Sequence, residues 1–167
     1  GAGIDVSGVI YDAEVPTTLA VVHNTPDGDR EFAFYRNPGA DLTLRAEEVD
    51  MAKIASSRVF HFGTLSAASE PARSATYAAV EQAKRSGCVI SFDPNLRLNL
   101  WPDAESAREQ IAYGLSQCDV LKISNDEIEF MTGEKDVCRG VEILLSRWDI
   151  PLVLATMGPD GSRAFYR

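Results

Sequence analysis

The chain has 167 residues, of which 45% are hydrophobic and 25% are charged, a composition typical of a globular protein with one core. Its net charge of −9 argues against a nucleic-acid-binding protein, which needs a basic face. Three cysteines without a C-x-x-C pair argue against a disulfide framework or a zinc site, and no apolar run is long enough to span a membrane. We therefore expect a cytoplasmic protein that binds neither nucleic acid nor membrane.

The N-terminal part of the chain predicts a β-hairpin. Residues 17–22 and 31–36 are rich in β-branched and aromatic side chains, and turn-forming residues fill positions 24–29 between them. An isolated hairpin would leave many of these apolar side chains exposed. We therefore expect the hairpin to cover another part of the protein or to pair with another sheet.

Farther along the chain, predicted strands alternate with predicted helices. The predicted strands are 58–62, 88–92, 119–124 and 151–156, and an extended segment follows at 163–166. The predicted helices are 46–54, 70–86, 103–117, 126–131 and 137–147. Strands and helices that alternate with short connections predict an α/β fold, with a mainly parallel sheet flanked by helices. Both ends of the sequence are abrupt, so we expect a piece of a larger domain.

Four of these strands end in glycine or polar residues. The segments concerned are Gly63-Thr64, D-P-N-L-R at 93–97, K-I-S-N-D-E at 122–127 and T-M-G-P-D-G at 156–161. Parallel strands bring their carboxyl ends to one edge of the sheet, where α/β proteins bind ligands. The sequence therefore predicts a site for a polar ligand at this edge.

Two cations at this edge could bind an anionic group. The planar guanidinium of Arg97 suits a phosphate or a carboxylate; alternatively, Asp93 caps the next helix and pairs with Arg97. Lys122 lies in an otherwise apolar strand, so it either pairs with a ligand's phosphate or carboxylate, or extends into solvent from an edge strand.

The remaining polar residues also allow two interpretations. Glu127 begins a helix, where its carboxylate is either a plain first-turn acid or a magnesium ligand through water. The glycines in Thr156-x-Gly158-x-x-Gly161 either let a ligand approach the backbone or form a hairpin turn. Arg36 either reaches a substrate beneath the hairpin or is a solvated edge residue. We interpret His61, Cys88 and Cys118 as core residues without a chemical role.

Six segments together resemble one known family. They are G-I-D-V-S-G-V (3–9), F-Y-R-N-P-G-A-D (34–41), V-F-H-F-G (59–63), F-D-P-N-L-R-L-N-L-W-P (92–102), L-K-I-S-N-D-E-I-E-F-M-T-G (121–133) and T-M-G-P-D-G (156–161). In this order they resemble the ribokinase (PfkB-type) carbohydrate kinases, particularly the fructokinases and 2-keto-3-deoxygluconate kinases. The resemblance runs over essentially the whole chain.

The resemblance implies a three-layer ribokinase-like α/β domain with a small β-sheet lid. The lid would be the hairpin at about 15–37 and the α/β core about 45–167. The implied reaction is ATP-dependent phosphorylation of a sugar hydroxyl with Mg²⁺, and the lid would join two copies into a homodimer. By this resemblance fructose would be the expected substrate. A 2-keto-3-deoxygluconate kinase is the alternative, because Arg36 and Arg97 suit a carboxylate, and a non-catalytic kinase-like assembly subunit is a further hypothesis.

The resemblance also implies roles for individual residues. The substrate-binding residues would be Phe34, Tyr35, Arg36, Gly63, Thr64 and Arg97. The nucleotide-binding residues would be Asn95, Leu96, Arg97, Lys122, Ser124, Glu127, Thr156, Gly158 and Gly161. Arg97 would stabilise the phosphate, and Glu127 would hold magnesium through water within the family's Asn-x-x-Glu motif, in which Ser124 replaces the asparagine.

Two motifs of the family have no match in this sequence. They are the N-terminal segment with its sugar-binding acid and Gly-Gly pair, and the C-terminal Gly-Ala-Gly-Asp, which supplies the catalytic base. We therefore expect an active parent protein and a 167-residue chain that is inactive alone.

Overall fold

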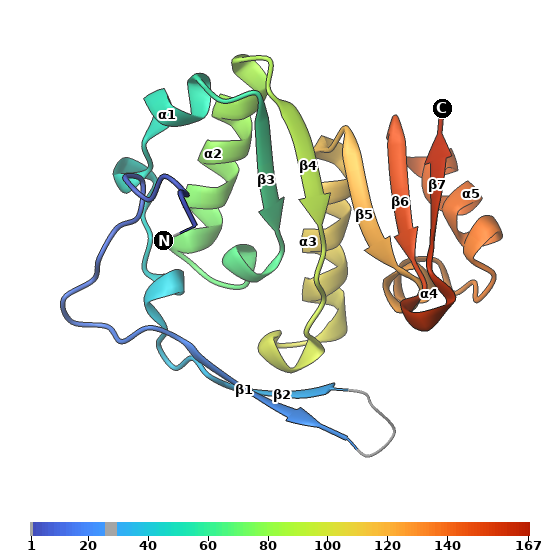
Figure 1. Cartoon of the computed structure of the whole chain (residues 1–167), viewed down its shortest axis with the longest axis horizontal. Coiled ribbons are helices and arrows are strands. Elements are labelled where there is room, and N and C mark those ends of the chain that lie inside the picture. The colour runs from blue at the N-terminus through green and yellow to red at the C-terminus, as the bar shows by residue number, and fades with distance from the viewer. Residues whose placement is uncertain (1, 26–29) are drawn as a thin grey trace.

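The computed structural model describes residues 2–25 and 30–167, which form two separate β-sheets (Figure 1). The small sheet pairs β1 (Leu19–Asn24) with antiparallel β2 (Arg30–Tyr35). The large sheet has the strand order β3-β4-β5-β6-β7. Its strands are Val59–Gly63, Val89–Asp93, Val120–Ser124, Leu152–Thr156 and Ser162–Tyr166. Because β3 to β6 are parallel and only β7 is antiparallel, the predicted mainly parallel α/β sheet with a separate hairpin is confirmed.

Helices connect the strands of the large sheet. They are α1 (Met51–Ala55), α2 (Ala72–Arg85), α3 (Ala104–Gln117), α4 (Asn125–Thr132) and α5 (Val137–Arg147). Short 3₁₀ turns lie at Ala40–Leu42, Ala46–Glu48, Leu65–Ala67, Leu98–Leu100 and Gly158–Asp160. In the described residues, no helix has the length and apolar character needed to cross a membrane.

Side-chain caps fix where several helices begin. The Asp103 carboxylate accepts a hydrogen bond from the Ser106 amide at 2.7 Å at the start of α3, and Asp136 accepts one from the Arg139 amide at 2.9 Å at the start of α5. Such caps satisfy amides that have no partner within the helix. The predicted helices at 103–117 and 137–147 are therefore confirmed.

Two predicted elements differ from the structure. The single helix predicted at 46–54 is a 3₁₀ turn followed by α1, because Asp50 accepts the Lys53 amide at 2.9 Å and starts a new helix. The first hairpin strand is Leu19–Asn24 instead of 17–22, and the hydroxyl of Thr18, just before it, donates to Asp41. Residues 26–29 of the turn predicted at 24–29 lie outside the described residues.

The core lies between the large sheet and α2 to α5. Alternate strand residues such as Phe92, Leu121 and Val153 are buried among these helices. The close approach of α3 requires Gly114, because a Cβ at this position would lie 2.1 Å from the Phe92 ring. Cys88 and Cys118 are buried, so their interpretation as core residues is confirmed.

The opposite face of the sheet carries no helix from the described residues. Val59, Val89 and Leu154 are exposed on this face, and His61 is exposed beside them. The interpretation of His61 as a core residue was therefore wrong, because the two-residue period of β3 turns Phe60 and Phe62, and not His61, toward the helices.

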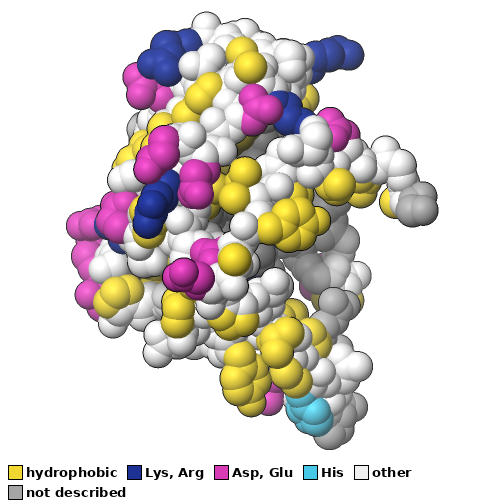
Figure 2. All heavy atoms as spheres, turned by 90° about the vertical axis from the view of Figure 1, so that its left-hand side faces the viewer, with side chains coloured by type: hydrophobic (Ala, Val, Ile, Leu, Met, Phe, Trp, Pro, Cys, Tyr) yellow, Lys and Arg dark blue, Asp and Glu magenta, His cyan; other side chains and the backbone are white. Residues whose placement is uncertain are grey.

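The β1–β2 hairpin, which we call the lid, lies beyond the carboxyl ends of β3 to β6 (Figure 1). Hydrophobic side chains gather on its projecting surface at the bottom of Figure 2. The lid is thus a separate small sheet, set opposite the sheet edge that the sequence predicts to bind a ligand.

Candidate functional site

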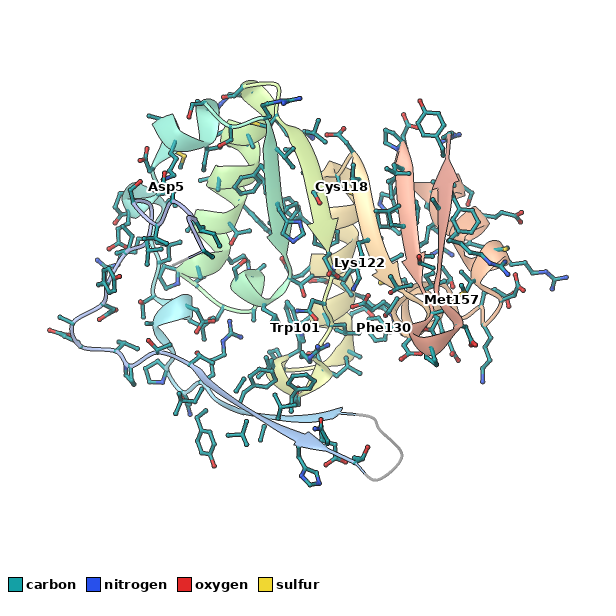
Figure 3. All side chains as sticks on the ribbon, viewed as in Figure 1. Asp5, Trp101, Cys118, Lys122, Phe130 and Met157 are labelled. Atoms are coloured by element: carbon teal, nitrogen blue, oxygen red, sulfur yellow. The ribbon has the colours of Figure 1, made fainter. Side chains whose placement is uncertain are left out.

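The predicted strand ends meet at one edge of the sheet. The register pairs Gly63 with Asp93 and Ser124 with Thr156. Lys122 and Met157 lie toward this end of the sheet (Figure 3). The structure therefore brings together the four segments that the sequence singled out.

At the end of β3, Gly63 and Thr64 make close contacts with β4 and the loop that follows it. A Cβ on residue 63 would lie 2.8 Å from the Asp93 carbonyl oxygen, so only glycine allows this approach. Thr64 is 1% exposed, and its hydroxyl donates to the Pro94 carbonyl at 2.6 Å. Both residues line a cavity of about 230 Å³, together with His61, Leu65, Ser66, Asp93 and Asn95.

Asp93 and Lys122 form an ion pair, with Lys122 Nζ 3.1 Å from Asp93 Oδ2. Asp93 Oδ1 also accepts a hydrogen bond from the Asn95 amide at 3.2 Å. The alternative in which Asp93 caps the next helix and pairs with Arg97 is therefore wrong, since Asp103 provides that cap. The edge-strand interpretation of Lys122 is also wrong, because β5 is the central strand of the sheet.

Glu127 is buried, with 6% of its surface exposed, and joins two backbone segments. Its Oε1 accepts the Leu96 amide at 2.7 Å, and its Oε2 accepts the Ser124 amide at 2.9 Å. The Ser124 hydroxyl in turn accepts the Glu127 amide at 3.3 Å, which completes a capping box. Glu127 therefore ties the start of α4 to the loop that carries Arg97.

Arg97 is half-buried in this loop. Its Nη1 donates to the Leu96 carbonyl at 2.8 Å, and its guanidinium lies 4.9 Å from the centre of the Phe32 ring. None of the ion pairs formed by the described residues involves Arg97. Because a partly buried charge without a counter-ion is costly, this guanidinium is suited to an anionic ligand.

The three predicted lid residues point in different directions. Phe34 is half-buried on the same strand face as Phe32, and the two rings stack at 6.1 Å. Tyr35 lies on the opposite face and is 69% exposed, because consecutive strand residues alternate. The structure therefore does not bring Tyr35 together with Phe34.

Arg36 lies at the base of the lid, and its side chain is only 6% exposed. Its Nε donates to Asp41 Oδ2 at 2.7 Å, and its Nη2 donates to the Leu65 carbonyl at 2.8 Å. Burial raises the pKa of Asp41, but the hydrogen bonds from Arg36 and Thr18 outweigh it and hold this pKa below its usual value. Arg36 is thus neither a solvated edge residue nor a free cation, but a link between lid and core.

Thr156 to Gly161 form the turn of the β6–β7 hairpin. Thr156 pairs with Ser162, and the Met157 amide donates to the Gly161 carbonyl at 2.8 Å. Gly158 and Gly161 have φ values of 55° and 89°, which favour glycine. The segment is thus a hairpin turn at the edge of the sheet that the sequence predicts to bind a ligand. Its contact with a nucleotide stays a prediction.

The described residues contain no group of three acidic, histidine or cysteine side chains that could hold a metal ion by themselves. Asp93 is paired with Lys122, and Glu127 accepts two amides. Each carboxylate oxygen of Glu127 has a further lone pair. This donor set fits a magnesium ion that keeps its waters and is bound mainly by phosphates, and not one enclosed by protein ligands.

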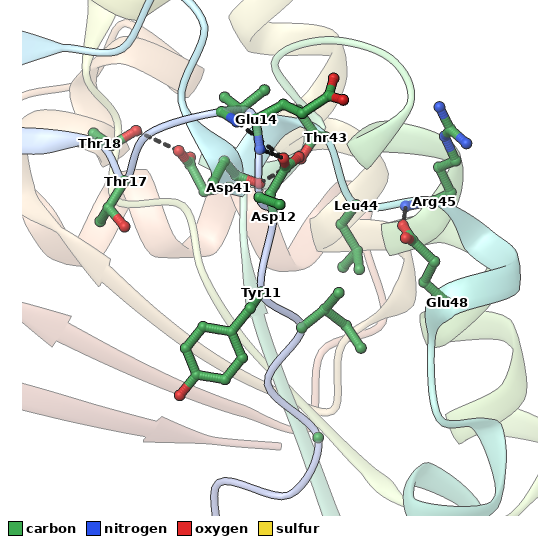
Figure 4. Close-up of a pocket in the computed structure, with 15 residues that line it drawn as sticks. Tyr11, Asp12, Glu14, Thr17, Thr18, Asp41, Thr43, Leu44, Arg45 and Glu48 are labelled. Carbon is green, nitrogen blue, oxygen red and sulfur yellow. Dashed lines mark hydrogen bonds between the residues drawn. The ribbon is translucent and has the colours of Figure 1, made fainter.

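A second cavity, of about 790 Å³, lies between residues 8–18 and 40–48 (Figure 4). Three of its four acids, Asp12, Asp41 and Glu48, already accept hydrogen bonds. Asp12 accepts the amides of Glu14 and Val15 and the Thr43 hydroxyl, and Glu48 accepts the Arg45 amide. None of its lining residues belongs to the four strand-end segments that the sequence predicts to bind a ligand.

Phe32 and Ser66 were missed in the sequence analysis. Phe32 could have been found, because it lies two residues before Phe34 and therefore on the same face of the strand. Nothing in the local sequence indicates that Ser66 would approach the end of β4.

Comparison with known proteins agrees with this geometry. Residues 1–167 match the profile of the pfkB family carbohydrate kinases. The chain is 44% identical to fructokinase-1 of Zea mays, covering 99% of this chain and 51% of that protein. It is also 44% identical to fructokinase-1 of Oryza sativa, covering 99% of this chain and 51% of that protein.

A solved structure gives the same result. The crystal structure of a Vibrio cholerae fructokinase with fructose, ADP and calcium ion bound has a TM-score of 0.86 and 30% identity, covering 98% of this chain and 52% of the other. The chain spans about half the length of the curated relatives it matches. On its sequence and its fold, this chain belongs to the pfkB family of carbohydrate kinases.

Proposed function

We propose that the protein carrying this chain transfers a phosphoryl group from ATP to a hydroxyl of fructose. The observation that carries the proposal is the similarity to the Vibrio cholerae fructokinase that holds fructose and ADP. The Arg97 guanidinium adds physical support, since a cation positioned at the strand ends would stabilise the charge of a transferring phosphoryl group.

The sugar would lie between the lid and the strand ends. Phe34 would contact it from the lid, and Gly63 and Thr64 would line its pocket. Arg36 would act by fixing the base of the lid, because two of its donors already bind Asp41 and Leu65. Tyr35, on the outer face, is a weaker candidate for a sugar contact.

The nucleotide would lie along the neighbouring strand ends. Its phosphates would be near Asn95, Leu96 and Arg97, with Lys122 and Ser124 beside them and Thr156, Gly158 and Gly161 forming the adjoining loop. Glu127 would hold magnesium through water, and the ion, when bound, would neutralise charge on the phosphates.

Phosphoryl transfer also needs a group that accepts the proton of the sugar hydroxyl. Asp93 is occupied by Lys122 and Glu127 by two amides, so neither is a good candidate. We expect this group in the part of the protein outside the 167 residues, and we predict that the chain alone produces no ADP in the presence of sugar.

We also propose a homodimer formed through the lid. On its outer face Leu19, Val21 and Tyr35 are exposed, and a second lid could bury this apolar surface. Sedimentation of the full-length protein should give a dimer, and Val21→Glu should shift it toward the monomer. A wild-type protein that sediments as a monomer would contradict this arrangement. A cytoplasmic location stays a prediction.

The function is tested with the full-length protein and a coupled assay for ADP. Fructose should be phosphorylated more efficiently than 2-keto-3-deoxygluconate, and Arg97→Ala should lower kcat on the order of 10²-fold. A preference for the keto sugar acid would favour the alternative substrate. Absence of sugar-dependent ADP production would favour the non-catalytic assembly subunit.

A further inference from the structure

The contact between Phe32 and Arg97 joins the lid to the candidate site at the carboxyl ends of the parallel strands. Phe32 belongs to β2, whereas Arg97 follows β4, and the guanidinium carbon lies 4.9 Å from the ring centre. Both side chains are half-buried. At this distance the negative face of the ring attracts the cation.

The hairpin register turns Phe32 toward the core. Phe32 lies opposite Val22, and Phe34 lies opposite Ala20, so these four residues share the inner face of the lid. The Phe32 ring stacks on Phe34 with an angle of 9° between their planes. Phe34 therefore supports the ring that contacts Arg97.

The described strands of the lid contact Arg97 through the aromatic ring of Phe32. Among the described side chains of β1 and β2, no hydrogen bond or ion pair reaches the α/β core. Arg97 itself donates one hydrogen bond, to the Leu96 carbonyl, and Glu127 holds the amide of the same residue. The guanidinium is thus oriented by its own loop on one side and by the Phe32 ring on the other.

The ring has an advantage over a carboxylate as a partner for this arginine. A carboxylate would neutralise the guanidinium and occupy its N–H groups. An aromatic face attracts the cation and leaves most of its in-plane donors free for an anion. A side chain that must be oriented and still bind phosphate is therefore better held by a ring.

We propose that Phe32 is a positioning residue that holds Arg97 toward the nucleotide phosphates and couples the lid to the phosphate subsite. This inference rests on the proposed kinase function. It predicts that changes in the ring alter nucleotide affinity through Arg97, although Phe32 itself does not contact the phosphates.

The experiment compares Phe32→Leu with Phe32→Tyr in the full-length protein. Leucine keeps apolar bulk without an aromatic face, whereas tyrosine keeps that face. Titration calorimetry with ADP should show about five-fold weaker binding for Phe32→Leu and wild-type binding for Phe32→Tyr. The KM for fructose should change less than the ADP affinity, because Phe32 contacts Arg97 directly and reaches the proposed sugar site only through its stack on Phe34.

A double-mutant cycle tests whether Phe32 acts through Arg97. In an Arg97→Ala background, Phe32→Leu should no longer change ADP affinity. An effect of the same size in both backgrounds would overturn the inference, as would an equal loss in Phe32→Tyr or a change confined to the fructose KM. Val22→Ala, opposite Phe32 in the lid, is the matched control, and a loss of ADP affinity equal to that of Phe32→Leu would also refute it.

The same titrations separate this inference from the proposed function. If the wild-type protein does not bind ADP, both are refuted. If the wild type binds ADP and the cycle shows no coupling, only the role of Phe32 is refuted. Circular dichroism and thermal melting of each variant show whether an affinity change reflects an unfolded protein.

Discussion

Replacing Glu127 should destabilise the protein even when no metal is present. Its two oxygens accept the amides of Leu96 and Ser124 at 2.7 and 2.9 Å, and a hydrogen bond to a charged group contributes about 1.5–3 kcal/mol. Glu127→Ala leaves both amides without this acceptor and should lower the free energy of unfolding by about 3–6 kcal/mol. Glu127→Gln keeps one acceptor oxygen and should lose about half as much.

The assay is urea unfolding of the full-length protein in EDTA, followed by circular dichroism. Glu129→Gln is the matched control, because Glu129 lies on the same helix in an exposed pair with Lys135 at 3.7 Å. This control should change the free energy of unfolding by less than about 1 kcal/mol. Suppose that Glu127→Gln has the same free energy of unfolding as the wild type in EDTA and differs from it only when magnesium is present. Glu127 would then act through the metal, and its role in joining Leu96 to Ser124 would be refuted.

Three further predictions concern packing, pH and thiol chemistry. Gly114→Ala should lower the free energy of unfolding by about 1–3 kcal/mol, because the new methyl group would lie 2.1 Å from the Phe92 ring. Thermal melting should therefore show a lower melting temperature, and an unchanged one would contradict this prediction. Burial raises the pKa of Asp41, but hydrogen bonds from Arg36 and Thr18 outweigh this effect and hold the pKa below its ordinary value. The stability that this carboxylate contributes is therefore present above that ordinary value and is lost as the pH falls through the lower pKa of the folded protein. Urea unfolding should therefore show Asp41→Asn to be destabilising at pH 7, and the difference from wild type should shrink at acid pH. Burial raises the pKa of Cys118 to about 12, so mass spectrometry after iodoacetamide treatment at pH 8 should find Cys138 alkylated and Cys118 intact.

Two features were predictable from the sequence, because both depend on local patterns. They are the order of strands and helices and the edge of the sheet at which the polar strand ends meet. Apolar runs such as 88–92 identify buried strands, and Asp103 identifies a helix start. Parallel topology then places the polar strand ends at one edge. Little more than periodicity and capping is needed for this part of the fold.

The pairing of side chains at the site was not predictable in the same way. Asp93 pairs with Lys122 and Arg36 with Asp41, whereas the sequence alone suggested Arg97 as the partner of Asp93. These pairs depend on how strands and loops are placed in three dimensions, which local patterns do not fix. For His61, local periodicity separates this residue from Phe60 and Phe62 but does not say which face of the sheet the helices cover.

The way in which the lid is held determines which experiments can detect its movement. Hydrogen bonds within the β1–β2 ladder join the two strands, and Arg36 fixes their base. A rigid-body swing of the lid would therefore leave its ladder amides protected from hydrogen exchange, because no ladder bond has to open. Such a motion should appear in relaxation dispersion of the Phe32 and Phe34 rings, while the exchange rates of the lid backbone stay slow.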